Sequence, residues 1–436
     1  MIPMRYFFIF IYCISCMPSD STLLTHSPMG HTLHHNSVFS PDGQWVVFDG
    51  RNDDTKIGET SVIGLLHVST GEEKVIYTTK DPTVYGPGVG AASFSPVRDF
   101  VIFIHGLPDA DQEKPYAMGR RTGVGIDISR PFEPVMMDAR DITSPYAAGS
   151  LRGGTHSHAW SGDGQLISFT YNDELVDADL RVVGVMVPYE PGVEVDSSPG
   201  NNPGTYYSAI VTEVVREPVL GSDEISKAFD ECWVGKEGYE DREGRHRPYA
   251  VAFQGHTRNA AGEVITEIYV VDIDPKQMMA DTEAVGKIGE RPQVPKGIHQ
   301  RRITFSEKGL SDTRHWLRSS PDGRYVYALA RDAQHRNQVI RVTVNTGEIR
   351  YLTRNKFSID FPLNISYDGR KICYLGGNRI YLLDVEREES VALTGGAGGK
   401  LVGAPVFSPE ENLIVYNQYV RNKQGEEFLQ IRKVRF

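Results

Sequence analysis

The feature that most constrains the fold is a short turn that recurs along the chain. In its fullest form it reads Phe/Trp-Ser-Pro-Asp-Gly, and it follows a short apolar strand and precedes an alternating one. Clear copies stand at 39–43, 94–96, 160–164, 319–323, 366–369 and 407–409. Pro, Asp and Gly supply the turn chemistry that joins two antiparallel strands. A repeat of roughly 40 residues built of short strands is typical of β-propeller blades.

A degenerate copy completes a set of seven. It lacks the Asp-Gly turn but keeps alternating strands at 249–253, 267–272 and 302–305. The last copy ends without an outer strand, and the segment 22–26 has the pattern of a strand without a blade. Pairing of this segment with the last copy would close the ring and remove the exposed sheet edges. We therefore expect an all-β, seven-bladed propeller over residues 22–436 as a single domain, closed by its N-terminal strand.

One segment does not follow the repeat. Residues 221–233 begin with a capping serine and place Ile225 and Phe229 four residues apart. This spacing predicts a short helical insert between blades three and four.

Composition and charge limit the classes of partner. The 43 Gly and 25 Pro suit many turns and short strands, and 46 basic against 57 acidic residues give a net charge of −11. That charge argues against nucleic acid as a partner. Past the N-terminal segment only Cys232 and Cys373 remain, which provide no disulfide framework and no metal-binding spacing.

The N-terminus has the features of an export signal. A positive charge at Arg5 precedes an apolar run over 6–14, which is too short to span a bilayer. Cys13-Ile14-Ser15-Cys16 is similar to a lipobox, so residues 1–16 are predicted to be a signal peptide with lipidation at Cys16. Ordinary signal cleavage is the alternative. The chain is expected in the periplasm or outer membrane, attached to a membrane only by a lipid anchor, and as a monomer.

Histidines recur at one slot of the repeat. Relative to the turn, His156 of blade three stands where His35 of blade one and His315 of blade five stand. These slots begin innermost strands, so the three side chains are expected to converge on the mouth of the central channel. His158 lies two residues after His156 and is expected on the same strand face, because the side-chain period of a strand is two. The channel mouth is the predicted site.

Other candidates lie on the connections at the same face. His105 and His256 end the second strands of their blades, Arg258 and Arg331 follow in comparable positions, and Asn172 precedes a long loop. Long loops on a rigid scaffold are where binding residues concentrate. All of these histidines have an alternative role as satisfied polar groups that fill the channel. No cofactor is expected, although imidazoles gathered at the mouth would suit a divalent metal.

Several longer motifs resemble a known family. They are Met137-Asp138-Ala139-Arg140-Asp141 leading into Arg152-Gly153-Gly154-Thr155-His156-Ser157-His158, together with Gly221-Ser222-Asp223-Glu224-Ile225 and Gln300-Arg301-Arg302-Ile303-Thr304-Phe305. With the propeller repeat, they resemble a bacterial family of TolB-like propellers that contains a domain of unknown function. The chain is also similar to the seven-bladed ulvan lyases of polysaccharide lyase family twenty-five.

The second resemblance implies cleavage of a uronate-containing polysaccharide by β-elimination. It implies His156 or His158 as the base, Arg258 as the group that neutralises the uronate carboxylate, and Tyr239 as the acid, with Tyr206 and Tyr207 as rivals. It implies substrate binding by His35, His105, Asn172, His256, His315 and Arg331. The partner would be an acidic polysaccharide or oligosaccharide. The alternative is a non-catalytic TolB-like propeller of the cell envelope that binds a peptide or protein.

Overall fold

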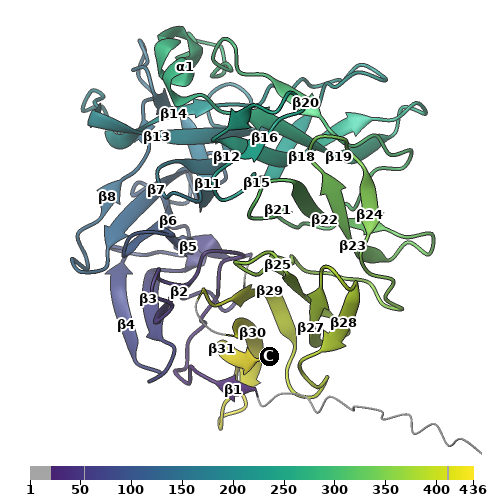
Figure 1. Ribbon diagram of the computed structural model, residues 1–436. Helices are drawn as coiled ribbons and strands as arrows, with labels where there is room; N and C mark the ends of the chain where they lie inside the picture. Colours follow the sequence, from purple (N-terminus) through teal and green to yellow (C-terminus); the bar gives the residue numbers. More distant parts are fainter. Residues whose placement is uncertain (1–20, 54, 410–411) are drawn as a thin grey trace, which may run out of the picture.

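Seven antiparallel sheets are arranged in a ring around a central channel in the computed structural model, which describes residues 21–53, 55–409 and 412–436 (Figure 1). Six of the sheets have four strands and one has three. The predicted seven-bladed propeller is therefore confirmed. Blades one to three consist of β2 (Trp45–Asp49), β3 (Val62–His67) and β4 (Glu73–Thr78); of β5 (Val89–Phe94), β6 (Phe100–Gly106), β7 (Arg121–Asp127) and β8 (Val135–Met136); and of β11 (Gly153–Trp160), β12 (Ile167–Asp173), β13 (Arg181–Val193) and β14 (Gly204–Ile210).

The other four blades repeat the pattern. They consist of β15 (Lys227–Trp233), β18 (Ala250–Arg258), β19 (Val264–Asp272) and β20 (Gln300–Arg302); of β21 (Arg318–Ser319), β22 (Tyr325–Arg331), β23 (Asn337–Thr343) and β24 (Ile349–Tyr351); of β25 (Asn364–Ile365), β26 (Lys371–Gly376), β27 (Arg379–Asp384) and β28 (Glu389–Ala392); and of β29 (Leu401–Phe407), β30 (Leu413–Arg421), β31 (Glu427–Arg435) and β1 (Thr22–Leu23).

The ring is closed by its N-terminal strand. β1 pairs antiparallel with β31, with Thr22 opposite Lys433 and Leu23 opposite Arg432 (Figure 1). Beyond the strand, the Leu24 amide donates to the Ile431 carbonyl at 2.9 Å and the Ile431 amide to the Thr25 hydroxyl at 2.9 Å. β1 thus covers the outer edge of β31 and makes the last blade four-stranded, so the two ends of the chain meet in one blade and close the ring.

The recurrent turn is held by the same side-chain bonds in each full copy. In blade one the Ser40 hydroxyl donates to the Asp42 carboxylate at 2.6 Å and accepts from the Trp45 amide at 2.9 Å, while Gly43 has a φ of 67°. The left-handed φ favours glycine because it has no Cβ. Equivalent serine–aspartate bonds occur at Ser161, Ser320 and Ser366. The motif thus specifies the turn through its side chains as well as its backbone.

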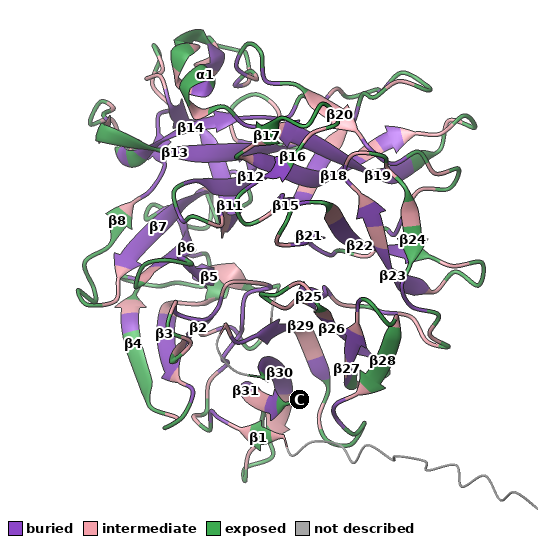
Figure 2. Ribbon diagram, viewed as in Figure 1, coloured by how far each residue is buried: buried purple, intermediate pink, exposed green. Residues whose placement is uncertain are grey.

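The core lies between the blades, and some outermost strands, such as β4 and β28, are mostly exposed (Figure 2). Aromatic rings on one strand of a blade fill the core, and a glycine on the next strand of the same blade makes room for each ring. Phe48 on β2 lies over Gly64, where a Cβ would come within 2.4 Å of the ring, and Phe169 on β12 lies over Gly184, where it would come within 2.3 Å. Both rings are buried.

The predicted helical insert is wrong. Residues 227–233 form β15, the innermost strand of blade four, and it pairs with β18. Ile225 and Phe229 have helical spacing, but pairing with β18 and burial of Ile225 against the core override that local preference. Helix occurs elsewhere, at η1 (Ile57–Glu59), α1 (Pro275–Ala280) and η2 (Thr282–Val285). Two small paired segments complete the elements, β9 (Ala139–Arg140) with β10 (Ser150–Leu151) and β16 (Tyr239–Glu240) with β17 (His246–Arg247).

Candidate active site at the loop face

The two ends of the central channel open into two different cavities. The larger, about 660 Å³, lies on the face of the long connections and is called the loop-face cavity. The smaller, about 220 Å³, lies on the face of the recurrent turns and is called the turn-face cavity. Titratable side chains that line the loop-face cavity include His34, Arg121, His156, Arg181, Asp230 and Arg314. The predicted channel-mouth site therefore coincides with a real cavity.

A β-bulge in β11 determines where the two central histidines point. The β11–β12 register shifts between His156 and Ala159, and Ser157 has a φ of 59°. A bulge of this kind breaks the period of two. His156 lines the loop-face cavity, whereas His158 is buried, its Nε2 3.1 Å from the Thr155 hydroxyl. The expectation that both histidines share one face is wrong.

His156 is a buried imidazole without a hydrogen-bond partner. Its side chain is 5% exposed, and neither ring nitrogen has a partner in the described part of the chain. Burial, followed by the charges of Arg121 and Arg181, lowers the pKa of His156 well below its usual value. The ring is therefore neutral at physiological pH, with one nitrogen free to accept a proton. An unsatisfied polar group in a cavity is a signature of a site that acts on a ligand.

Three arginines make the cavity cationic. Arg121 donates from Nη1 to the Tyr116 hydroxyl at 2.9 Å and from Nε to the Met118 carbonyl at 3.3 Å. Arg181 donates to the Asn172 side chain at 3.3 Å, and Arg314 lies over the Trp316 ring at 4.5 Å. No ion pair between described residues includes any of the three, whereas Arg51 beside them is paired with Asp49. Their charge is available to an anionic ligand.

Tyr116 supplies a hydroxyl beside these charges, and sequence reasoning missed it. It lies with Arg121 at the end of the long connection between β6 and β7, and its hydroxyl accepts from Arg121. Burial raises the pKa of Tyr116, so the hydroxyl keeps its proton at neutral pH. The length of this connection was the one signal in the sequence, because an irregular loop gives no register from which to choose its inward-facing residues.

Asp230 is the acidic group of the cavity. It stands at the bulge of β15 with a φ of 53°, is 5% exposed, and its Oδ2 has no partner in the described chain. Burial raises the pKa of Asp230 to about 6, against the opposing charges of Arg314 and Arg181. A non-glycine residue in the left-handed region costs about 1–3 kcal/mol and tends to occur at functional sites. The segment once expected to be helical thus provides a residue of the site.

The other two histidines of the shared slot, His35 and His315, differ from His156 in their surroundings. His35 stacks on Trp316 with ring centroids 3.8 Å apart, and Arg318 lies 3.0 Å from its Nδ1. It contributes to the floor of the cavity. His315 has both nitrogens engaged, Nδ1 with the Thr313 carbonyl at 2.6 Å and Nε2 with the Leu329 amide at 3.0 Å. His315 lines neither cavity, and the alternative of a satisfied structural imidazole describes it.

The candidates on the connections lie behind or outside the cavity. His105 contacts the Tyr77 hydroxyl at 2.9 Å, and Asn172 accepts from Arg181 and so supports it rather than lining the cavity. His256 packs against Phe229. Arg258 and Arg331 do not line the cavity and form ion pairs with Glu217 and Asp312.

The structure does not bring Tyr239 to the cavity. It lies on β16, in the connection between β15 and β18 on the turn face, where its hydroxyl donates to Asp272 at 2.8 Å and accepts from Arg301 at 3.0 Å. Its rivals Tyr206 and Tyr207 lie on β14, the outermost strand of blade three. The resemblance implied Tyr239 as the acid, but its hydroxyl is bonded to Asp272 and Arg301 and it does not line the loop-face cavity. Cys16 lies outside the described residues.

The donor set does not fit a metal ion held by the histidines. Within the described ranges, no group of three or more His, Cys, Asp or Glu side chains is arranged to hold one. His315 has both ring nitrogens bonded to backbone groups, and the Nδ1 of His35 lies beside the Arg318 guanidinium, so neither histidine forms a ligand set with His156.

The buried titratable groups also set the pH dependence of stability. Burial lowers the pKa of His158 to about 3 and that of His315 to about 4. Below the unfolded value near 6.5 the unfolded chain binds protons that these groups do not, so their contribution is lost as pH falls toward 4 and 3. Burial raises the pKa of Glu231 to about 8. Its contribution has the opposite sign and is lost as pH rises from the unfolded carboxyl value near 4.3 toward 8.

Comparison with known proteins identifies a family model that matches part of the chain and a relative that covers most of it. Residues 88–201 match the model of the family DUF3748, which is described as a protein of unknown function. The uncharacterized protein YidR of Escherichia coli is 33% identical over 403 residues, which cover 89% of this chain and 92% of that protein. These matches span the loop-face residues Tyr116, Arg121 and His156.

Solved propellers share the fold at low sequence identity. An oligogalacturonate lyase in complex with manganese superposes with a TM-score of 0.56 at 12% identity, covering 97% of this chain and 94% of the other. An oligogalacturonate lyase from Vibrio parahaemolyticus gives 0.54 at 11% identity, over 97% and 94%. TolB from Acinetobacter baumannii is more distant, with 0.39 at 14% identity over 90% and 80%. No helix in the described ranges is long and apolar enough to cross a membrane.

Proposed function

This chain belongs to the family of Escherichia coli YidR and contains a DUF3748 region. For this member of the family, we propose a lyase function, the cleavage of uronate-containing saccharides by β-elimination. The observation that supports the proposal is the surroundings of His156, a buried and unpartnered imidazole in a cavity that also contains Tyr116, Arg121 and two further arginines outside ion pairs, Arg181 and Arg314. The similarity in fold to oligogalacturonate lyases agrees with this class of substrate.

The residue types match the three requirements of the reaction. The C5 proton of a uronate becomes acidic enough to remove when a cation offsets the carboxylate, which is the role assigned to Arg121. A neutral imidazole takes that proton, the role assigned to His156. The C4–O bond then breaks, a C4–C5 double bond forms, and the leaving oxygen receives the proton of the Tyr116 hydroxyl. No water or redox partner is consumed.

Substrate binding would itself activate the base. In the free protein, the charges of Arg121 and Arg181 contribute to the lowered pKa of His156. A uronate carboxylate bound between these side chains offsets their charge, and the pKa of His156 rises toward the range in which a base is effective. The His156 imidazole is thus neutral in the free protein, and it becomes more basic when the uronate carboxylate binds.

Asp230 has a separate role in this proposal. A carboxylate would repel the uronate group, so Asp230 faces another part of the sugar and accepts hydrogen bonds from ring hydroxyls. Its free Oδ2 and strained backbone are consistent with that assignment. A sulfate or acetyl ester in place of such a ring hydroxyl would weaken binding, because the ester has no proton to donate to the Asp230 carboxylate.

The test is the ultraviolet absorbance of the new double bond. The protein is incubated with oligogalacturonides, polygalacturonate, ulvan and a glycosaminoglycan, and the panel identifies the polymer. His156→Ala should lower kcat/KM by about 100-fold or more, the usual contribution of a general base, while the neighbouring His158→Ala should retain turnover if it folds. Arg121→Met should abolish turnover, and the matched rim variant Arg258→Met should not.

Absence of the double bond with every uronate substrate, from folded protein, would overturn the proposal. Saturable binding without turnover, insensitive to His156→Ala, would instead support the alternative of a TolB-like binding propeller of the cell envelope. We also propose export and lipidation at Cys16. Cell fractionation of Cys16→Ala tests this, because the variant should leave the membrane fraction.

A further inference from the structure

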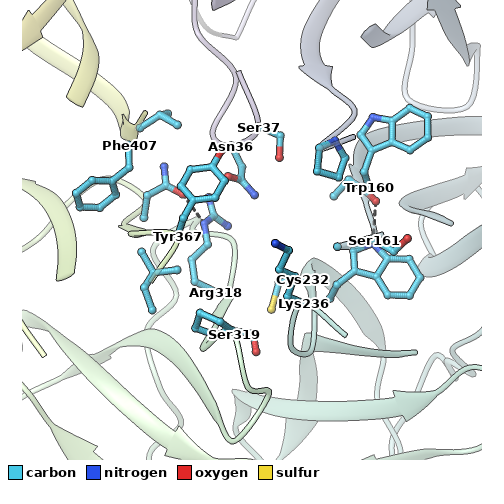
Figure 3. Close-up of a pocket in the computed structure, with 18 of the residues that line it drawn as sticks. Asn36, Ser37, Trp160, Ser161, Cys232, Lys236, Arg318, Ser319, Tyr367 and Phe407 are labelled. Carbon is cyan, nitrogen blue, oxygen red and sulfur yellow. Dashed lines mark hydrogen bonds between the residues drawn. The ribbon is translucent and has the colours of Figure 1, made fainter. Parts of the chain in front are cut away.

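The turn-face cavity is built like a second binding site at the other end of the channel. It has a volume of about 220 Å³ and is lined by the ends of innermost strands from several blades. Figure 3 shows side chains arranged around an open centre, with Tyr367 and Phe407 on one side and Trp160 on the other. The His35–Trp316 stack and Arg318 lie between this cavity and the loop-face cavity. The two sites are therefore distinct.

Two buried polar groups of this cavity have no partner. Trp160 is 6% exposed and its indole N–H is unsatisfied, and Glu231 is 2% exposed and its Oε1 is unsatisfied. The other carboxylate oxygen of Glu231 accepts from the Thr170 hydroxyl at 3.1 Å. A buried group without a partner costs about 1–3 kcal/mol, so such groups call for an explanation such as a ligand.

The charge of the cavity favours an anion. Arg318 is buried and bonds only neutral groups, the Asn364 side chain at 2.5 Å and the Leu317 and His35 carbonyls at 2.7 and 2.8 Å. Lys236 adds an exposed cation at the rim, and no ion pair between described residues includes either side chain. Burial raises the pKa of Glu231 to about 8, so at neutral pH this group is mostly an O–H donor without charge.

We propose that the turn-face cavity binds a small organic carboxylate whose body has the size of one sugar ring or one amino-acid side chain. The carboxylate accepts hydrogen bonds from Lys236, the Trp160 indole and protonated Glu231, and the body of the ligand packs on the exposed ring of Tyr367. The volume is below the usual range of about 300–1,000 Å³ for larger ligands, which excludes an oligomer. This site does not depend on catalysis at His156.

The test uses the Arg121→Met protein, in which anion binding in the loop-face cavity is weakened, and the Lys236→Gln substitution made in the same background assigns the remaining binding to the turn-face cavity. Galacturonate and N-acetylphenylalanine are titrated by calorimetry, with methyl galactoside as the uncharged control, and tryptophan emission is followed because Trp160 and Trp233 line the cavity. We expect one of the two carboxylates to bind at one site per chain, and the galactoside not to bind. The arm that binds identifies a sugar acid or an amino-acid derivative as the source.

Variants locate the binding. Lys236→Gln, at an exposed position, should weaken affinity about ten-fold, the scale of a charge-assisted hydrogen bond. Lys276→Gln on α1 is the matched control and should change nothing. Binding of neither carboxylate at millimolar concentration would overturn the proposal, as would binding that Lys236→Gln leaves unchanged. The lyase assay on the wild-type protein is independent of these titrations. A failure of binding at the turn-face cavity can therefore be distinguished from a failure of the proposed lyase function.

Discussion

Arg121 and Arg51 line the same cavity but are held in opposite ways, and replacing each by methionine should separate function from stability. Arg121 is buried and has no carboxylate partner, whereas Arg51 forms a two-bond pair with Asp49. Methionine keeps much of the apolar stem and removes the charge in both cases. We expect Arg121→Met to remove activity with little change in stability, and Arg51→Met to destabilise the fold.

The magnitude for Arg121 follows from two opposing contributions. The variant loses hydrogen bonds to the Tyr116 hydroxyl at 2.9 Å and the Met118 carbonyl at 3.3 Å, each worth about 1.5–3 kcal/mol for a charged donor. It also relieves the burial of an unpaired cation, a penalty of several kcal/mol. The net change should lie within about 2 kcal/mol of zero. With an unfolding entropy of about 2.1 cal/mol/K per residue over 436 residues, this corresponds to a shift in Tm of at most about 2 °C.

For Arg51 the balance differs because a partner is left behind. Asp49 is fully buried and receives Arg51 Nε at 2.6 Å and Nη2 at 2.8 Å. Breaking a buried pair by removing one member costs about 3–5 kcal/mol. The same entropy converts this to a fall in Tm of about 3–5 °C.

Calorimetric unfolding and the double-bond assay, run on the same preparations, check both expectations. If Arg121→Met falls in Tm as far as Arg51→Met does, then Arg121 is a structural residue and the argument from its missing carboxylate is wrong. If Arg121→Met unfolds like the wild type and retains full turnover, it does not bind the carboxylate.

Three further outcomes are expected. Tyr116→Phe should fold normally and lose turnover by about 100-fold, because it removes the acid alone, whereas Tyr85→Phe outside the cavity should not; equal turnover would exclude Tyr116. Urea unfolding should show stability falling as pH drops below about 6.5, where the unfolded chain binds protons that the buried histidines do not, and declining gently from there toward pH 8. Glu231→Gln should abolish the gentle decline, and its persistence would assign it to another group. Leu24→Ala beside β1 should cost about 2–3 kcal/mol, measured against Val84→Ala at an exposed site, and equal stability would show that closure does not depend on this strand.

The fold was predictable because its information is local and repeated. Each full turn is specified by a serine, an aspartate and a glycine within a few residues, and a strand-and-turn pattern that recurs in seven copies leaves few alternatives to a ring. Blade four shows the limit of this reasoning. There the turn motif is absent, and residues 227–233 form a strand because β18 pairs with them, although Ile225 and Phe229 have helical spacing. Long-range pairing cannot be read from that spacing.

The site was predictable only where a candidate stood on the repeat. His156 was found from its slot on an innermost strand, but its relation to His158 was misjudged because the bulge at Ser157 reverses the alternation. Tyr116 and Arg121 end a long irregular connection, where no periodicity indicates which side chains turn inward. Asp230 was hidden within a segment that was expected to be helical.

The departures from the repeat, rather than the repeat itself, form the candidate site. Innermost strands of several blades contain a left-handed residue near their middle, among them Ala91, Ser157 and Asp230. In blade three the bulge aims His156 at the cavity, and in blade four the left-handed residue is itself the acid. A closed ring of seven blades can tolerate this strain because pairing and packing on every side fix the strands that contain it. On this reasoning, Ser157→Gly should relieve the strain and stabilise the fold, while loosening His156 and lowering turnover; a gain in both stability and turnover would contradict it.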